Sequence, residues 1–230
     1  MRLIALAFGM VLLAGPITAQ RPVSIPVMDS AAGKPAQIQG DLYGSGRRAV
    51  LLAHGGRFNK DSWKEQAPLL ARAGFLVLAI NFRGDTFNAN GTPSANGSDE
   101  DNATDVLAAA AYLRGMGART IAAIGASLGG DAVGDAEARL GGGVFDRMIF
   151  LGSEGGDAPA MLRGRKLYIV ARGDSNGDGL RLPGISRHYD RAPEPKQLIV
   201  LDGTAHAQFL FATDAGSELM RDILKFLSAK

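Results

Sequence analysis

The sequence predicts an α/β protein with a mainly parallel, twisted sheet and helices on both faces. Three features support this fold class. Short apolar runs recur along the chain, segments with helical periodicity lie between them, and glycine-rich turns are spread throughout. Continuous apolar runs are typical of strands that are buried on both faces of a parallel sheet. Strands that alternate with helices imply crossover connections, and therefore such a sheet.

The N-terminus has the pattern of a secretory signal peptide. Arg2 precedes an apolar run over residues 3–14, Gly15 and Pro16 break the run, and Ala19 offers a small residue before the cut. The run is shorter than the roughly 20 residues that a membrane span needs, so we expect cleavage after Ala19 rather than an uncleaved anchor. The sequence therefore predicts an exported protein, periplasmic or extracellular, with no stable membrane anchor after cleavage.

Length and composition limit what the remaining chain can be. Residues 20–230 are predicted to form one α/β domain, because this length suits one full core and is short for two. The formal net charge is +2 and no basic cluster is present, so nothing indicates nucleic acid as a partner. The chain contains no cysteine, which excludes disulfides and zinc sites built on thiolates.

The expected strands follow from the apolar runs in chain order. Residues 23–43 carry short, loosely alternating segments around Gly33 and Gly40, which predict antiparallel strands at the start. Six buried strands are then predicted at residues 49–53, 75–80, 120–124, 148–151, 167–171 and 198–201. Ligands of such sheets bind at the carboxyl ends of the strands. We therefore expect the functional residues directly after these runs.

The clearest helical pattern consists of Val106, Ala109, Ala110 and Leu113, which recur at i, i+3, i+4 and i+7. The acidic residues 99–101 precede this pattern, and their charges suit the N-terminus of a helix. The sequence therefore predicts a helix that packs its apolar face on the sheet.

Two further helices are expected. Residues 219–227 give the closing helix an apolar face, and residues 63–70 show a weaker pattern in which Pro68 either kinks the helix or restarts it. The long polar stretch 85–102 is the least structured part of the chain by composition. It is either a loop beside the site or a solvated connection.

Residues 125–129 read G-A-S-L-G and lie between the strand at 120–124 and a predicted helix. A sharp strand-to-helix turn needs glycines on both flanks, because larger side chains would collide as the backbone doubles back. Such a turn exposes Ser127 at the end of the strand, as a nucleophile requires. The N–H of Leu128, at the start of the helix, can then stabilise an oxyanion.

A second oxyanion donor is expected after the first long strand. His54, Gly55 and Gly56 follow the apolar run 49–53, and a turn of this kind presents a backbone N–H toward the same oxyanion. We assign this role to Gly56, with Arg57 as the alternative. His54 itself is interpreted as a structural loop residue.

A serine nucleophile needs a base, and histidine is suited to this role near neutral pH. Only three histidines exist. His206 lies after the last apolar strand and before the final helix, at the expected edge of the sheet, whereas His188 stands among arginines on a predicted solvated helix. His206 is therefore the predicted base.

The imidazole needs a carboxylate that fixes its tautomer. Asp174 follows the strand at 167–171 and is the predicted acid, with Asp178 and Asp202 as competitors. Residues 174–179 also read D-S-N-G-D-G, the first half of a calcium loop. The twelfth position is Ile185, where such a loop needs a bidentate carboxylate. No metal and no cofactor are therefore expected.

The order Ser127, Asp174 and His206, with H-G-G upstream, resembles the α/β-hydrolase superfamily, especially its compact dienelactone-hydrolase-like and serine-esterase-like members. The resemblance covers nearly all of residues 20–230, including 51–84, and the family's nucleophile, acid and base positions match these three residues. It implies an α/β-hydrolase fold without a cap domain, because only 46 residues separate Ser127 from Asp174. Dienelactone hydrolases use a cysteine nucleophile, so their particular substrate does not carry over.

The predicted function is that of a secreted serine hydrolase that cleaves a carboxylic ester, or a similar small acyl substrate, through an acyl-enzyme on Ser127. An amidase, peptidase or thioesterase with the same triad is the first alternative. A hydrolase-like binding protein without catalysis is the second. Aromatic residues either line an acyl pocket or pack in the core; they are Phe58, Trp63, Phe82, Phe87 and Phe209.

Overall fold

The computed structural model describes residues 20–29, 33–87, 93–95 and 98–229. The predicted signal peptide, residues 1–19, lies outside the described residues. Within the described part of the chain, no helix has both the length and the apolar character to cross a bilayer.

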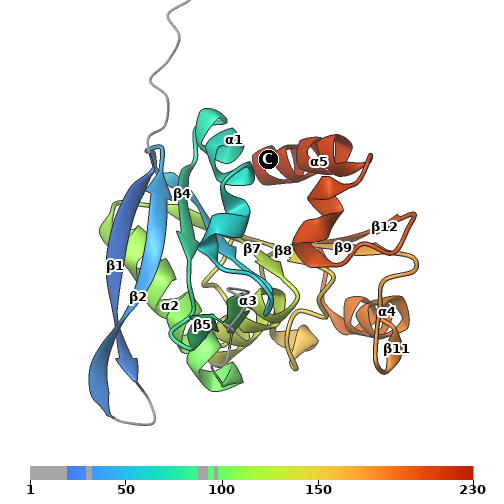
Figure 1. The fold of residues 1–230 in the computed structure, drawn as a ribbon, viewed down its shortest axis with the longest axis horizontal. Coiled ribbons are helices and arrows are strands. Elements are labelled where there is room, and N and C mark those ends of the chain that lie inside the picture. The colour runs from blue at the N-terminus through green and yellow to red at the C-terminus, as the bar shows by residue number, and fades with distance from the viewer. Residues whose placement is uncertain (1–19, 30–32, 88–92, 96–97, 230) are drawn as a thin grey trace, which may run out of the picture.

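One eight-stranded sheet forms the centre of the molecule, with the strand order β1-β2-β4-β3-β7-β8-β9-β12. Its strands are β1 (Arg21–Asp29), β2 (Lys34–Tyr43), β3 (Arg48–Ala53), β4 (Leu76–Ile80), β7 (Thr120–Ala126), β8 (Arg147–Leu151), β9 (Arg165–Ala171) and β12 (Lys196–Leu201). β1 pairs with β2 and β2 with β4 in antiparallel fashion, and every pair from β4 to β12 is parallel. Figure 1 shows this sheet from β1 at the left edge to β12 at the right. All six predicted strands and the antiparallel start are confirmed, but the strand predicted at 198–201, β12, is only partly buried because it lies at the edge of the sheet.

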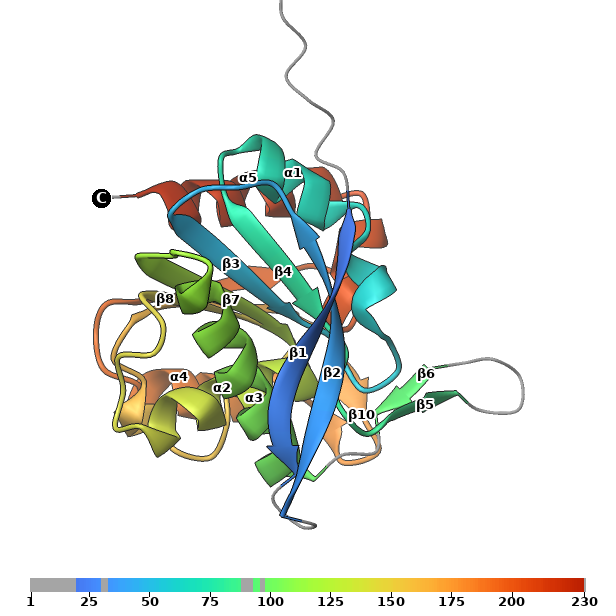
Figure 2. The ribbon, with the colours of Figure 1, turned by 90° about the vertical axis from the view of Figure 1, so that its left-hand side faces the viewer.

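Helices cover both faces of the sheet, as predicted. α1 (Gln66–Arg72) and α5 (Gly216–Ser228) pack on one face, while α2 (Asp99–Gly115), α3 (Leu128–Arg139) and α4 (Leu182–Arg191) pack on the other. Figure 2 shows the two layers with the sheet between them. The described residues also contain short 3-10 helices, which are η1 (Lys60–Trp63), η2 (Pro159–Met161) and η3 (Ala207–Ala212).

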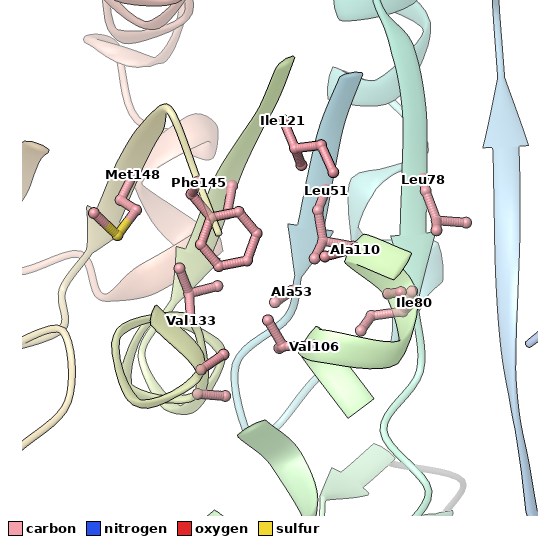
Figure 3. Close-up of a cluster of buried hydrophobic side chains, with 14 of the residues drawn as sticks. Leu51, Ala53, Leu78, Ile80, Val106, Ala110, Ile121, Val133, Phe145 and Met148 are labelled. Atoms are coloured by element: carbon pink, nitrogen blue, oxygen red, sulfur yellow. The ribbon is translucent and has the colours of Figure 1, made fainter. Parts of the chain in front are cut away.

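The two helical layers explain why the central strands are apolar without alternation. On β3, Leu51 and Ala53 pack under α2 and α3, while Val50 and Leu52 face the layer of α1 and α5. Figure 3 shows the first of these two cores, with Val106 of α2 directed at the sheet. Side chains that alternate between two buried faces must all be apolar.

Two local expectations need correction or refinement. The stretch 85–102 contains a small hairpin, β5 (Asp85–Phe87) with β6 (Pro93–Ala95), and its last four residues already belong to α2. The side chain of Ser98 accepts a hydrogen bond from the N–H of Asp101 and caps that helix. The predicted helix over residues 63–70 is interrupted and restarts near Pro68, which was one of the two alternatives. η1 ends at Trp63, and α1 begins at Gln66.

One buried charge stands out in the sheet. Lys166 on β9 is fully buried, and its Nζ donates to the carbonyl oxygen of Leu162 at 2.9 Å. Burial, together with neighbouring Lys196, lowers the pKa of Lys166 from 10.5 to about 8, although Glu194 acts in the opposite direction. The charged lysine therefore destabilises the folded state.

This burial predicts a pH-dependent stability. Between the folded pKa of about 8 and the unfolded value of 10.5, the unfolded chain binds more protons, so raising the pH favours folding. We expect the unfolding free energy of the wild type to rise relative to Lys166→Met by about 1–2 kcal/mol between about pH 7 and pH 9.5. Urea denaturation at both pH values measures this change. A difference that stays constant with pH would contradict the prediction.

Candidate active site

Ser127 sits on a strained turn between β7 and α3. Its backbone has φ 49° and ψ −122°, a conformation that is costly for a residue with a side chain. A Cβ placed on Gly125 would lie 2.4 Å from the carbonyl oxygen of Gly129, so the turn closes only with glycine there. The N–H of Ser127 donates to the carbonyl oxygen of Leu151 on β8 at 2.9 Å, which fixes the turn to the sheet.

Both predicted oxyanion donors lie beside this turn. Leu128 is the first residue of α3, where the N–H has no acceptor within the helix. Gly56 lies in a turn closed by the N–H of Phe58, which donates to the carbonyl oxygen of Gly55 at 3.0 Å. A Cβ on Gly56 would be 3.6 Å from Leu128 Cδ1. The turn after β3 and the start of α3 are therefore in contact.

His206 and Asp174 are joined by a short hydrogen bond. Nδ1 of His206 donates to Oδ2 of Asp174 at 2.8 Å, and the carboxylate is fully buried. This bond places the proton on Nδ1 and leaves Nε2 free to accept one. Gly152, after β8, packs against the pair, because a Cβ there would lie 2.9 Å from the imidazole and 3.0 Å from the carboxylate.

The competing carboxylates lie elsewhere. Asp178 is in the turn of the hairpin formed by β10 (Ser175–Asn176) and β11 (Gly179–Leu180), and its N–H donates to the Asn176 side chain. The carboxylate of Asp202 is 99% exposed and forms a loose ion pair with Arg172 at 3.6 Å. Neither pairs with His206, so among the three candidates Asp174 is the carboxylate that the fold brings to the imidazole.

The other two histidines have different surroundings. His54 is fully buried beside Phe82, with ring centroids 5.0 Å apart, and its Nδ1 bonds to the carbonyl oxygen of Gly55. His188 lies on α4, as expected, and most residues of this helix are at least partly exposed. Its own side chain is 17% exposed, and its Nε2 pairs with Glu154 at 2.8 Å.

Ser127 and His206 face one cavity of about 370 Å³. Phe58 and Phe209 line this cavity and stack edge to face with their centroids 5.1 Å apart. The remaining lining residues are Gly55, Gly56, Arg57, Leu128, Ser175, Arg181 and Ala207. An apolar wall beside a nucleophile and a base suits a substrate with a polar reacting group and an apolar body.

Trp63 and Phe82 do not line this cavity. Trp63 is fully buried in the core with α1, and Phe82 is buried against His54. The side chain of Phe87 lies outside the described residues. Phe58 and Phe209 are therefore the aromatic candidates that the fold assigns to the site.

The sequence did not identify Arg181, which precedes α4. Its N–H donates to the carbonyl oxygen of Asp174 at 2.9 Å, and its Nε lies 3.5 Å from Asp174 Oδ1. No local pattern marks this residue, because the contact depends on how the β10–β11 hairpin folds back over the end of β9.

The calcium-like pattern at residues 174–179 begins at a residue that takes part in the His206 contact. Asp174, this first residue, directs its carboxylate to His206. Among the residues that the structure describes, no group of three or more His, Asp or Glu side chains could hold a metal ion.

Comparisons with known proteins agree with this architecture. The family described as "alpha/beta hydrolase fold" matches residues 48–133. A non-heme haloperoxidase from Rhodococcus erythropolis is 31% identical over 112 residues, which cover 48% of this chain and 38% of that protein. The match therefore spans well under half of the relative's length.

Solved structures resemble this chain over most of its length. An esterase from Pyrococcus furiosus superposes with a TM-score of 0.69 and 16% identity, covering 91% of this chain and 92% of its own. A dienelactone hydrolase from Anabaena variabilis gives 0.68 and 18%, covering 91% and 96%. At such identities the likeness concerns the fold, and it extends across a compact chain without a cap domain.

Proposed function

Because the chain belongs to the α/β-hydrolase superfamily, we propose that it is a serine hydrolase that cleaves carboxylic esters through an acyl-enzyme on Ser127. One observation carries this proposal. The strained serine and the Asp174–His206 pair come from three separate strand ends, yet Ser127 and His206 face the same cavity. A packing turn would need neither the strain nor a buried carboxylate held against an imidazole.

The mechanism follows from these positions. Nε2 of His206 takes the hydroxyl proton while Ser127 Oγ attacks the ester carbonyl, and the N–H groups of Leu128 and Gly56 stabilise the oxyanion. The intermediate collapses as His206 returns the proton to the departing alcohol, which leaves an acyl group on Ser127. Water then attacks this acyl-enzyme with His206 as the base, and the carboxylic acid is released.

Labelling with a fluorophosphonate tests the proposal without knowledge of the substrate. We expect covalent labelling of the protein, with the added mass located by peptide mass spectrometry on Ser127. Matched acetyl esters, amides and thioesters then decide the leaving group, since the same triad serves all three. A folded protein that takes up no label supports the alternative of a binding protein without catalysis.

The Phe58–Phe209 pair is proposed to limit the length of the acyl group. Both residues also line a second cavity of about 280 Å³, so their stacked rings separate it from the catalytic cavity. Phe209 lies on η3 and is 52% exposed. Removing its ring would join the two cavities.

This geometry predicts a change in chain-length preference for Phe209→Ala. We expect the ratio of kcat/KM for octanoyl over acetyl esters to rise by about fivefold or more, since each buried methylene contributes about 0.8 kcal/mol. Leu140→Ala is the control, because Leu140 is 65% exposed and lines no part of the catalytic cavity. If the octanoyl-to-acetyl ratio is unchanged in Phe209→Ala, the Phe58–Phe209 pair does not limit the length of the acyl group.

Export is proposed from the N-terminal pattern alone. Residues 1–19 carry the basic, apolar and small-residue segments of a signal peptide. N-terminal sequencing of the protein from a periplasmic or culture fraction should begin at Gln20. Protein that retains Met1 in the cytoplasm would contradict export.

A further inference from the structure

Arg181 touches the catalytic acid from the side opposite the base. Oδ2 of Asp174 accepts the hydrogen bond of His206, while Oδ1 lies 3.5 Å from Nε of Arg181. That distance is too long for a hydrogen bond but short for two opposite charges. The carboxylate is 1% exposed and the guanidinium 30%, so water screens the pair less than it would a surface pair.

Arg181 also lines a third, strongly acidic cavity of about 270 Å³. Five carboxylates line it, and Arg181 is the only cationic residue among its lining side chains. The five are Asp99, Asp131, Asp135, Glu154 and Asp157. Arg181 also lines the catalytic cavity. Arg181 therefore borders both cavities and lies beside Asp174, while Gly152 also lines the acidic cavity and packs against the Asp174–His206 pair.

Two carboxylates of the acidic cavity have raised pKa values. Burial raises the pKa of both Asp131 and Asp135 above the usual value, although Asp131 accepts hydrogen bonds from Ser153 and from the backbone of Gly155. Such carboxylates become negative at a higher pH than solvated ones. Without a cation beside the Asp174–His206 pair, their field would favour the protonated imidazole.

We propose that Arg181 is a positioning residue whose positive charge beside the Asp174–His206 pair offsets the field of the acidic cavity, so that His206 can act as a base at lower pH. This inference rests on the proposed function for its catalytic meaning. Its electrostatic content concerns only the Asp174–His206 pair.

The other charged groups near the pair lie on different segments of the chain from Arg181. Arg57 lines the catalytic cavity from the turn after β3. Arg172 and Asp202 form an exposed ion pair near the ends of β9 and β12. His188 on α4 is held by Glu154. A change confined to Arg181 therefore isolates the contribution of one cation.

The test compares Arg181→Met, Arg181→Lys and the control Arg172→Met with the wild type. Arg172→Met also removes one positive charge near this edge of the sheet, but from a side chain that is 67% exposed. The first readout is the pH dependence of kcat/KM for an acetyl ester. The second is the NMR titration of the His206 ring, assigned by comparison with His206→Ala, which needs no turnover.

We expect Arg181→Met to move both the acid limb of kcat/KM and the midpoint of the His206 titration upward by about 0.5–1 pH unit. Arg181→Lys should return both toward the wild type, and Arg172→Met should leave both in place. A rate that falls equally at all pH values, with the ring titration unmoved, would show a merely structural role and overturn the inference. So would an equal shift in Arg172→Met.

The two readouts separate this inference from the proposed function. A wild type that neither turns over esters nor takes up the fluorophosphonate would refute the hydrolase, whereas the ring titration would still report the effect of Arg181. Conversely, if the enzyme is active but the titration of the His206 ring is the same in Arg181→Met as in the wild type, the proposed function stands and this inference is refuted. The melting temperature of each variant verifies that the fold is intact.

Discussion

Ser127→Ala is expected to lower kcat/KM for any accepted ester by about 10⁴-fold or more and to abolish fluorophosphonate labelling. The hydroxyl is the only group proposed to form the covalent bond, so nothing else in the cavity replaces it. Alanine tolerates the positive φ at this position no worse than serine does. The free energy of unfolding should therefore stay within about 0.5 kcal/mol of the wild type.

The cavity offers a matched control for this prediction. Ser175, on β10, is the other serine that lines it, and Ser175→Ala should retain turnover within about tenfold of the wild type. Steady-state kinetics with one acetyl ester, together with urea denaturation, measure both variants. Activity that survives Ser127→Ala but disappears with Ser175→Ala would show that Ser127 is not the nucleophile.

Gly129→Ala is expected to damage both the fold and the oxyanion site. A Cβ at this position would lie 2.4 Å from the carbonyl oxygen of Ala53 and 2.5 Å from that of His54. These are backbone atoms of β3 and its turn, so the start of α3 must move away from them. We expect the free energy of unfolding to fall by about 2–4 kcal/mol. Turnover should fall as well, because Leu128 moves with the helix.

Gly115→Ala is the control for this substitution. Gly115 ends α2, and a Cβ there would meet no atom within 4 Å. Alanine at such a position should be neutral or stabilise by up to about 1 kcal/mol. Urea denaturation of both variants measures the contrast. Equal stabilities for the two would mean that the close approach of α3 to β3 is not a constraint on the fold.

Strands, helices and the nucleophile turn could be predicted because their signals are local. A buried parallel strand such as β7 must be apolar on both faces, which makes it visible as a run, and the turn at Ser127 needs glycine at 125 and 129 for steric reasons. The acidic residues 99–101 marked the start of α2. These properties belong to short segments and do not depend on what packs against them.

Where several residues of one type were candidates for the same place in the site, only the tertiary structure showed which of them lies there. Asp174, Asp178 and Asp202 all follow strands closely, and the paths of the β10–β11 hairpin and the loop after β12 determine which one meets His206. Likewise, Phe58 lies in the cavity while Trp63, a few residues later, lies in the core. Local sequence does not specify these outcomes.

By itself, the sequence determined the α/β class, the strands along the chain and the residues predicted as nucleophile and base. The tertiary structure decided which carboxylate meets His206, which aromatic residues line the cavity and that Arg181 lies beside Asp174. The physical reason is the range of the interactions. Periodicity and turn geometry act over a few residues, whereas hydrogen bonds and charge pairs of the site join segments that only the sheet order brings together.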